Sequence, residues 1–95
     1  MNTVHRPEGW SSVNNALQRT YTFDSFTDAI AFVNDVAKLA ESQNHHPDIT
    51  INYRKVALAL TTHDSGGITE KDLVLAGSIN ELPGYVKHPL TLPNR

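Results

Sequence analysis

The 95-residue sequence contains no cysteine, only one methionine and only one tryptophan. Disulfide bonds and thiolate metal sites are therefore excluded, and we expect a cytoplasmic protein. No apolar run approaches the roughly 18–20 residues of a membrane span, and the polar start, Met1-Asn2-Thr3-Val4-His5-Arg6, differs from a signal peptide. The formal charge of −2 gives no electrostatic reason to expect nucleic acid binding. We expect neither a membrane nor nucleic acid among its partners.

The first half of the sequence predicts a strand pair and a helix. The strands cover residues 10–13 and 16–23, on either side of the turn-prone pair Asn14-Asn15. A helix then runs from a cap at Ser25 to about Gln43. Its spacings of three and four indicate one apolar stripe, made of Phe26, Ala29, Ile30, Val33, Val36, Ala37 and Ala40.

The second half predicts the same order again. Strands over residues 49–53 and 56–61 alternate apolar and polar side chains. Thr69 caps a second helix that reaches Leu82, with Asp72 as its capping-box partner.

This element order predicts an α+β fold, a four-stranded antiparallel sheet with two helices packed on one face. A chain of this length fits one domain. We divide it into an N-terminal arm over residues 1–8, a domain over 9–82 and an extended tail over 83–95.

Three histidines, His45, His46 and His63, fall in two short polar segments on either side of the second strand pair. We expect His63 to end the last strand, immediately before the loop at Gly66-Gly67. Histidine titrates near neutral pH, so such a cluster can give and take protons. Consecutive side chains in an extended chain point to opposite faces, so only one of His45 and His46 can share a pocket with His63.

The residues alone leave three interpretations open. The histidines could be surface or capping residues without a chemical role. They could hold a metal, with His45 or His46, His63 and a carboxylate such as Glu41 or Asp64 as ligands, although the spacing matches no recognised zinc motif. They could also perform acid–base catalysis without a metal, which needs one neutral and one protonated imidazole.

Two motifs carry a resemblance to a known family. Glu41-x-x-x-His45-His46-Pro47-Asp48, followed by Thr61-Thr62-His63-Asp64-x-Gly66-Gly67-Ile68-Thr69-x-x-Asp72, resembles pterin-4a-carbinolamine dehydratase. Further matching positions, beginning at Gly9-Trp10, extend the resemblance over roughly residues 9–82.

The resemblance implies a hydro-lyase that converts 4a-hydroxytetrahydropterin to quinonoid dihydropterin in tetrahydrobiopterin recycling. It implies that no metal or cofactor takes part, and that the enzyme works beside an aromatic amino acid hydroxylase. Animal members also bind a homeodomain transcription factor. The alternative function is therefore a non-catalytic module for pterin binding, dimerisation or transcriptional coactivation on the same fold.

Carried over by motif position, the resemblance implies that His45 and His63 are the acid–base pair and that His46 completes the catalytic set. Which histidine is the acid stays open. It further implies homodimers paired through sheet edges, tetramers joined through helices and, in many members, a third helix before Gly9. The positions that the resemblance gives to substrate binding or support are Glu41, Pro47, Thr62, Asp64 and Asp72.

Overall fold

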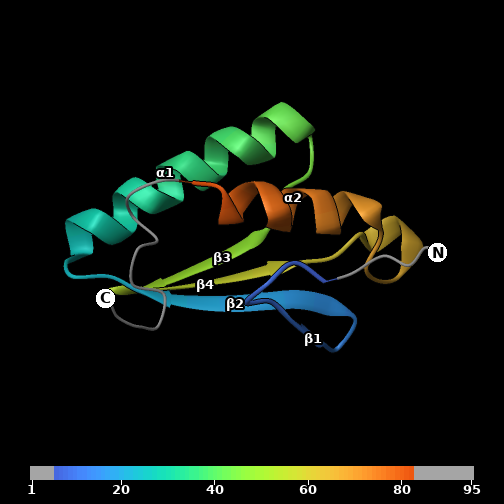
Figure 1. The fold of residues 1–95 in the computed structure, drawn as a ribbon, viewed down its shortest axis with the longest axis horizontal. Coiled ribbons are helices and arrows are strands. Elements are labelled where there is room, and N and C mark those ends of the chain that lie inside the picture. The colour runs from blue at the N-terminus through green and yellow to red at the C-terminus, as the bar shows by residue number, and fades with distance from the viewer. Residues whose placement is uncertain (1–5, 83–95) are drawn as a thin grey trace.

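The structure, a computed structural model, describes residues 6–82, so the predicted tail and residues 1–5 of the predicted arm lie outside the described residues. Both helices lie on one side of the sheet, which confirms the predicted α+β fold (Figure 1). Residues 6–10 contain a turn, and no third helix precedes the first strand in this part of the chain. The elements are β1 (Ser11–Val13), β2 (Ala16–Thr22), α1 (Phe26–Gln43), β3 (Asp48–Asn52), β4 (Lys55–Leu60), the 3₁₀ turn η1 (His63–Ser65) and α2 (Glu70–Asn80).

The strands form one antiparallel sheet in the order β1-β2-β4-β3. Across its central pair, Leu17 lies opposite Leu60 and Tyr21 lies opposite Val56. All four side chains are buried, because alternate residues of both strands point to the face that the helices cover.

Left-handed backbone conformations close both hairpins. Asn14 and Asn15 have φ values of 52° and 65°, the pattern of a type I′ turn, and they connect β1 to β2 as predicted. Tyr53 has a φ of 56° and begins the turn between β3 and β4, so the prediction that it ends a strand is wrong. The guanidinium of Arg54 lies over its ring, 5.5 Å from the centroid.

Helix α1 begins at the predicted cap, where Oγ of Ser25 accepts the backbone N–H of Asp28 at 3.0 Å. The predicted apolar stripe is partly wrong. Phe26 is 50% exposed and Ala37 is exposed, whereas Phe32, outside that stripe, is fully buried. The reason is that the Phe32 ring packs against Tyr21 of the sheet, with 4.6 Å between centroids, which rotates the buried face towards Phe32 and away from Phe26 and Ala37. The buried residues of α1 are Ala29, Phe32, Val36 and Ala40.

Helix α2 has the complete capping box that the sequence predicts. Oγ1 of Thr69 accepts the backbone N–H of Lys71, and Oδ2 of Asp72 accepts the backbone N–H of Thr69 at 2.8 Å. The helix ends at Asn80, before the predicted end at Leu82, because the last turn tightens into i to i+3 hydrogen bonds. No helix within residues 6–82 is long and apolar enough to cross a membrane.

A polar cluster fastens the segment before β1 to the end of α2. Oδ1 of Asn80 accepts Nε1–H of Trp10 at 3.0 Å and Nη1–H of Arg19 at 2.9 Å, while its Nδ2 donates to the carbonyl of Glu8. Gly9 has a φ of +89°, and a Cβ built there would lie 2.4 Å from Nη1 of Arg19. Glycine therefore suits this position for its backbone and for its small size.

Candidate active site

The end of helix α1 sets the direction of His45. Asn44 adopts the left-handed conformation, with φ of 52° and ψ of 43°, and its backbone N–H bonds to the carbonyls of Ala40 and Glu41. The backbone N–H of His45 also bonds to the carbonyl of Ala40, at 3.0 Å. These bonds end the helix sharply, and the His45 ring can then reach α2.

His45 pairs with a buried carboxylate on α2. Its Nε2 lies 2.5 Å from Oδ1 of Asp72, which is fully buried, while the His45 side chain is 12% exposed. Burial by itself raises the pKa of Asp72, but hydrogen bonds from His45, the Thr69 backbone and Thr62 outweigh it and hold this pKa below its ordinary value. Asp72 is therefore ionised at neutral pH.

Two threonines complete the surroundings of this carboxylate. Oγ1 of Thr62 lies 2.8 Å from Oδ2 of Asp72 and 2.7 Å from Oγ1 of Thr69. Thr62 follows β4 and Thr69 caps α2, so the network joins the end of α1, the end of the sheet and the start of α2. Three of the predicted site residues, His45, Thr62 and Asp72, meet in this network.

His46 has a separate partner. Its Nε2 lies 2.7 Å from Oε2 of Glu41, and both side chains are well exposed. The neighbouring histidines thus bond to different groups, as expected for consecutive side chains in an extended chain. Pro47 is half-buried and leads directly into β3.

His63 lies on a short loop next to the network. The prediction that it ends a strand is wrong, because β4 ends at Leu60 and His63 opens the 3₁₀ turn η1. Thr62 and Gly67 pair as an isolated bridge that closes this loop, and Gly66 supplies the left-handed residue, with a φ of 74°. His63 and Asp64 are both exposed. The loop therefore joins His63 to the network through the preceding residue, Thr62.

A hollow of about 310 Å³ opens beside His45. It lies between the end of α1 and the first turns of α2, and its size falls at the lower end of the range for small-molecule pockets. It is lined by Gln43, His45, Glu70, Lys71 and Val74.

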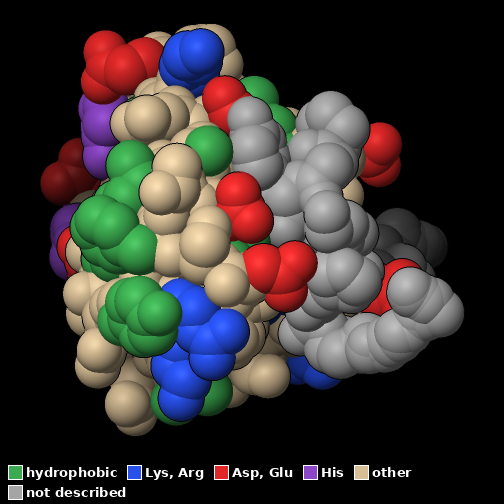
Figure 2. Space-filling view, turned by 90° about the vertical axis from the view of Figure 1, so that its left-hand side faces the viewer, with side chains coloured by type: hydrophobic (Ala, Val, Ile, Leu, Met, Phe, Trp, Pro, Cys, Tyr) green, Lys and Arg blue, Asp and Glu red, His purple; other side chains and the backbone are tan. Residues whose placement is uncertain are grey.

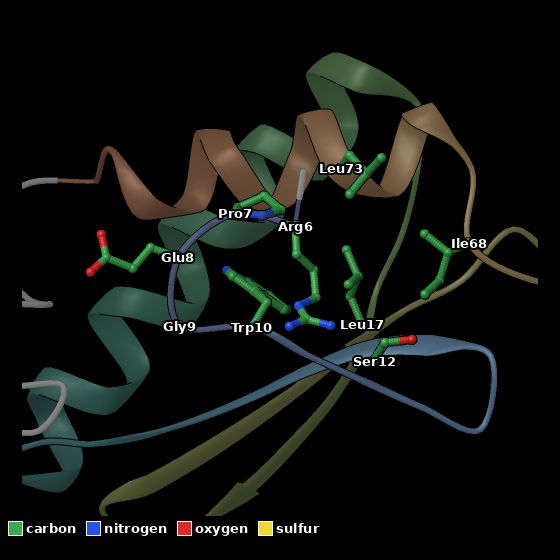
Figure 3. A pocket seen from close by; sticks show the side chains of 9 residues that line it. All are labelled: Arg6, Pro7, Glu8, Gly9, Trp10, Ser12, Leu17, Ile68 and Leu73. Carbon is green, nitrogen blue, oxygen red and sulfur yellow. The ribbon is translucent and has the colours of Figure 1, made fainter. Parts of the chain in front are cut away.

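A larger hollow, of about 550 Å³, lies elsewhere, between the segment before β1 and α2 (Figure 3). Trp10, Leu17 and Leu73 are among the residues that line it, and none of the predicted site residues does. Its ionisable side chains are those of Arg6 and Glu8, and Figure 3 shows Glu8 pointing away from it. We therefore place the candidate site at the hollow beside His45.

The metal interpretation finds no ligand set in this part of the chain. Within residues 6–82, no three histidine or carboxylate side chains lie close enough together to hold a metal ion. His45 and His46 each pair with a single carboxylate instead.

Comparison with known proteins decides the family. A family model described as pterin 4 alpha carbinolamine dehydratase matches residues 2–82. The chain belongs to this family. It is 58% identical over 74 residues to a protein of Thermomicrobium roseum, which covers 78% of this chain and 80% of the relative. A relative from Chloroflexus aurantiacus is 57% identical over 81 residues, covering 85% and 86% of the two chains. Both relatives carry the name pterin-4-alpha-carbinolamine dehydratase in provisional form.

Solved structures show the same fold. A transcriptional coactivator/pterin dehydratase from Brucella melitensis is 34% identical with a TM-score of 0.77, over 82% of this chain and 85% of that one. A pterin dehydratase-like protein, described as a RuBisCO assembly factor of the alpha-carboxysome, shares the fold with a TM-score of 0.65 and 22% identity.

The sequence prediction included neither Thr69 nor Asn44 in the candidate site. Thr69 was expected only as a helix cap, yet its hydroxyl also bonds to Thr62 inside the network. The available signal was Asp72, which the sequence placed both in the capping box and among the site residues. Asn44 was given no part, although an asparagine at a helix end is itself a signal for the left-handed turn that directs His45.

Proposed function

We propose that the protein removes water from 4a-hydroxytetrahydropterin to give quinonoid dihydropterin, with His45 and His63 as the acid–base pair. The observation that carries this proposal is the pairing of His45 with the buried, ionised Asp72. His63 is exposed on the adjoining loop, so the two imidazoles have different surroundings. Acid–base catalysis needs such a difference, because one ring must donate a proton while the other accepts one.

The chemistry requires two proton movements and no change of oxidation state. The C4a–oxygen bond breaks, and a proton from the acid converts the departing hydroxide to water. A ring nitrogen of the pterin loses its proton to the base, and its electron pair forms the new double bond to C4a. Each such group typically contributes about 10²–10⁴ in rate.

We assign the substrate to the hollow beside His45. His63 does not line this hollow, so in this proposal the substrate extends from it towards the loop that carries His63. Gln43 and Glu70 line the hollow with hydrogen-bonding groups, and Val74 adds an apolar surface that is 52% exposed. In this proposal His46 and Glu41 contact the substrate from the solvent side, while Pro47 and Asp64 shape the two segments that carry the histidines. No metal or cofactor takes part, so dialysis against a chelator should leave the rate unchanged.

The reaction would be the first step in recovering a tetrahydropterin cofactor after an aromatic amino acid hydroxylase has consumed it. Its product, quinonoid dihydropterin, still needs a two-electron reduction by a separate reductase. The 4a-carbinolamine is the species that such a hydroxylase releases, which is why the two enzymes would act in sequence. The test is to generate the carbinolamine with a phenylalanine hydroxylase and follow its ultraviolet decay. The protein, His45→Ala and His63→Ala should be compared, with Thr20→Ala on the exposed face of β2 as the control.

Faster decay with the wild-type protein and with Thr20→Ala, but not with the two histidine variants, is the expected result. Decay that the folded wild-type protein does not accelerate would contradict the proposal. If that protein still bound a pterin, the site would be a binding module on the same fold.

We also propose that the protein works as a homodimer paired along β3. This strand is a sheet edge, longer than the three-residue edge strand β1, and its Ile51 is 40% exposed. Exposed edges of this kind pair readily with another chain. Figure 2 views the end of the molecule that carries the β3–β4 turn and shows hydrophobic side chains gathered beside basic ones.

Sedimentation tests the dimer. Ile51→Lys should shift the protein towards a monomer, whereas Thr50→Lys, the neighbouring position on the opposite sheet face, should shift it less. A wild-type protein that sediments as a monomer at high concentration would contradict pairing along β3.

A further inference from the structure

We propose that Thr62 and Thr69 are positioning residues that hold His45 in one tautomer, with hydrogen on Nε2, so that Nδ1 exchanges protons with the substrate. The catalytic meaning of this inference rests on the function proposed above. The tautomer itself is a property of the folded protein and can be measured without substrate.

The argument begins with the hydrogens around Asp72. An ionised carboxylate only accepts hydrogen bonds, so each group that contacts it must be the donor. Its Oδ1 therefore receives a hydrogen from Nε2 of His45, and its Oδ2 receives hydrogens from Oγ1 of Thr62 and from the backbone nitrogen of Thr69. Nε2 of His45 thus carries a hydrogen whether the ring is neutral or charged.

Only one arrangement of the two threonine hydroxyl hydrogens is consistent with an Asp72 carboxylate that only accepts hydrogen bonds. Thr62 has a single hydroxyl hydrogen, and Asp72 takes it. The 2.7 Å contact between the two hydroxyls must then use the hydrogen of Thr69, with Thr62 as acceptor. Oγ1 of Thr69 in turn accepts the backbone N–H of Lys71. Every hydrogen points towards the carboxylate, from Thr69 to Thr62 and from Thr62 to Asp72.

Helix capping alone does not account for Thr62. The capping box of α2 consists of Thr69 and Asp72, and it is complete without a third side chain. Thr62 lies outside the helix, immediately before His63, and adds a second donor to the same oxygen that the cap uses. Its position suits the control of Asp72 and, through Asp72, of the His45 ring.

Loss of the Thr62 donor should change how the hydrogens are distributed between Asp72 and His45. Hydrogen bonds to the ionised form lower the pKa of Asp72, so removing one raises it. A protonated Asp72 would donate to Nε2 of His45 and move the ring hydrogen to Nδ1. His45, which follows α1, is the ionisable partner of Asp72. The other ionisable groups near this pair are Glu70 and Lys71 of α2, which line the same hollow as His45.

The first experiment measures the tautomer by ¹⁵N NMR of histidine-labelled protein, with the His45 signals assigned from the His45→Ala variant. In the wild-type protein near neutral pH, the pyridine-like signal of the neutral ring should come from Nδ1. In Thr62→Val part of it should come from Nε2, and Thr69→Val should change it in the same direction. Thr62→Ser keeps the hydroxyl donor and should give the wild-type spectrum.

A matched control is available one residue away. Oγ1 of Thr61 donates to the carbonyl of Asn15 and takes no part in the network, so Thr61→Val should leave the His45 signals unchanged. Circular dichroism establishes that each variant is folded. If Thr62→Val does not fold, Thr62→Cys replaces it, because a thiol is only a weak donor.

The second experiment is the pH dependence of the dehydration rate. Thr62→Val should lower kcat about tenfold or more, with less effect on KM, and should move the acidic limb of the profile to higher pH. A His45 ring with hydrogen on Nδ1 in the wild-type protein would overturn the inference. So would Thr62→Val with an unchanged spectrum and profile. If no dehydration is found at all, the spectra still decide the positioning role, and only the proposed function fails.

Discussion

Nε2 of His45 and Oδ1 of Asp72 lie 2.5 Å apart, with the carboxylate fully closed off from solvent. The adjacent histidine, His46, makes a contact of similar length, 2.7 Å, to Glu41, but there both side chains are well exposed. Two neighbouring histidine–carboxylate pairs therefore share their chemistry and differ in burial. The same substitution should affect them differently.

His45→Ala should destabilise the protein much more than His46→Ala. The first change removes a donor from a buried carboxylate, which costs about 1–3 kcal/mol in the free energy of unfolding. The second breaks an exposed pair, worth about 0–1 kcal/mol. Urea unfolding of the two variants under the same conditions measures both values. Equal losses would contradict the expectation that burial makes the His45 pair the more stabilising one.

Asp72→Asn should destabilise the protein in a pH-dependent way. The folded-state pKa of Asp72 is lowered, so its ionised form stabilises folding above the ordinary aspartate pKa, about 3.9, and this stabilisation is lost as the pH falls through the lowered value. The difference in unfolding free energy between wild type and Asp72→Asn should be about 2–4 kcal/mol near neutral pH and should shrink below about pH 4. Unfolding curves at a series of pH values give this difference, and a pH-independent gap would contradict the assignment.

Much of the fold follows from local pattern in this sequence. Alternation specified β3 and β4, and Thr69 with Asp72 specified the start of α2, because these signals involve residues close together in the chain. The buried face of α1 was predicted only in part, because Phe32 was left out of it. It depends on Phe32 meeting the ring of Tyr21, and helical spacing alone does not contain a contact between distant segments.

The candidate site was likewise predicted only in part from the sequence. Motif positions named His45, Thr62 and Asp72, but only the structure shows that one buried carboxylate joins the other two. The prediction that His63 ends a strand was wrong, because the chain after β4 closes into a loop through Thr62 and Gly67. A turn of this kind depends on the left-handed conformation of Gly66, which a Gly-Gly pair permits without specifying.

Tyr21→Phe should leave stability unchanged or raise it by up to about 1 kcal/mol. The hydroxyl of Tyr21 is buried and has no hydrogen-bond partner in the described part of the chain, so its removal relieves a desolvation cost. Thermal and urea unfolding measure the change, with Phe32→Ala as a reference that should lose about 3–5 kcal/mol. A loss above about 1 kcal/mol in Tyr21→Phe would mean that the hydroxyl is bonded in solution.

The same residue gives a signal at high pH. Burial raises the pKa of Tyr21 to about 12, against a smaller opposing effect of Arg19. The unfolded chain releases this proton at about pH 10, so wild-type stability should fall as the pH rises from there towards the raised value. Tyr21→Phe should lack this part of the decline, and its ultraviolet titration should lack the tyrosinate signal near pH 12.

Val74→Trp should fill the hollow beside His45 and weaken substrate binding. Val74 is 52% exposed, so a larger side chain fits there without disturbing the core. We expect KM for the carbinolamine to rise about tenfold, the change that about 1.4 kcal/mol of lost binding produces, with a smaller change in kcat. Val13→Trp is the matched control, because Val13 is 42% exposed on β1 and does not line this hollow. Unchanged KM in Val74→Trp would place the substrate elsewhere.

Asn80→Ala should release the segment before β1 from the end of α2. The substitution removes the acceptor for Trp10 and Arg19, and the donor to the carbonyl of Glu8, at a position where all three bonds are 3.0 Å or shorter. Because Trp10 is only 3% exposed, its indole N–H would lose its partner without gaining full access to water, and we expect a cost of about 1–3 kcal/mol.

Tryptophan fluorescence reads this change directly, since the chain contains a single tryptophan. Asn80→Ala should shift the emission to longer wavelength before global unfolding begins, and far-ultraviolet circular dichroism should keep the helices intact. Asn80→Asp is the discriminating variant, because its carboxylate keeps the acceptor for Trp10 and Arg19 and loses only the bond to Glu8. It should retain the wild-type emission. If Asn80→Asp and Asn80→Ala shift the emission equally, the acceptor oxygen is not what holds Trp10 in place.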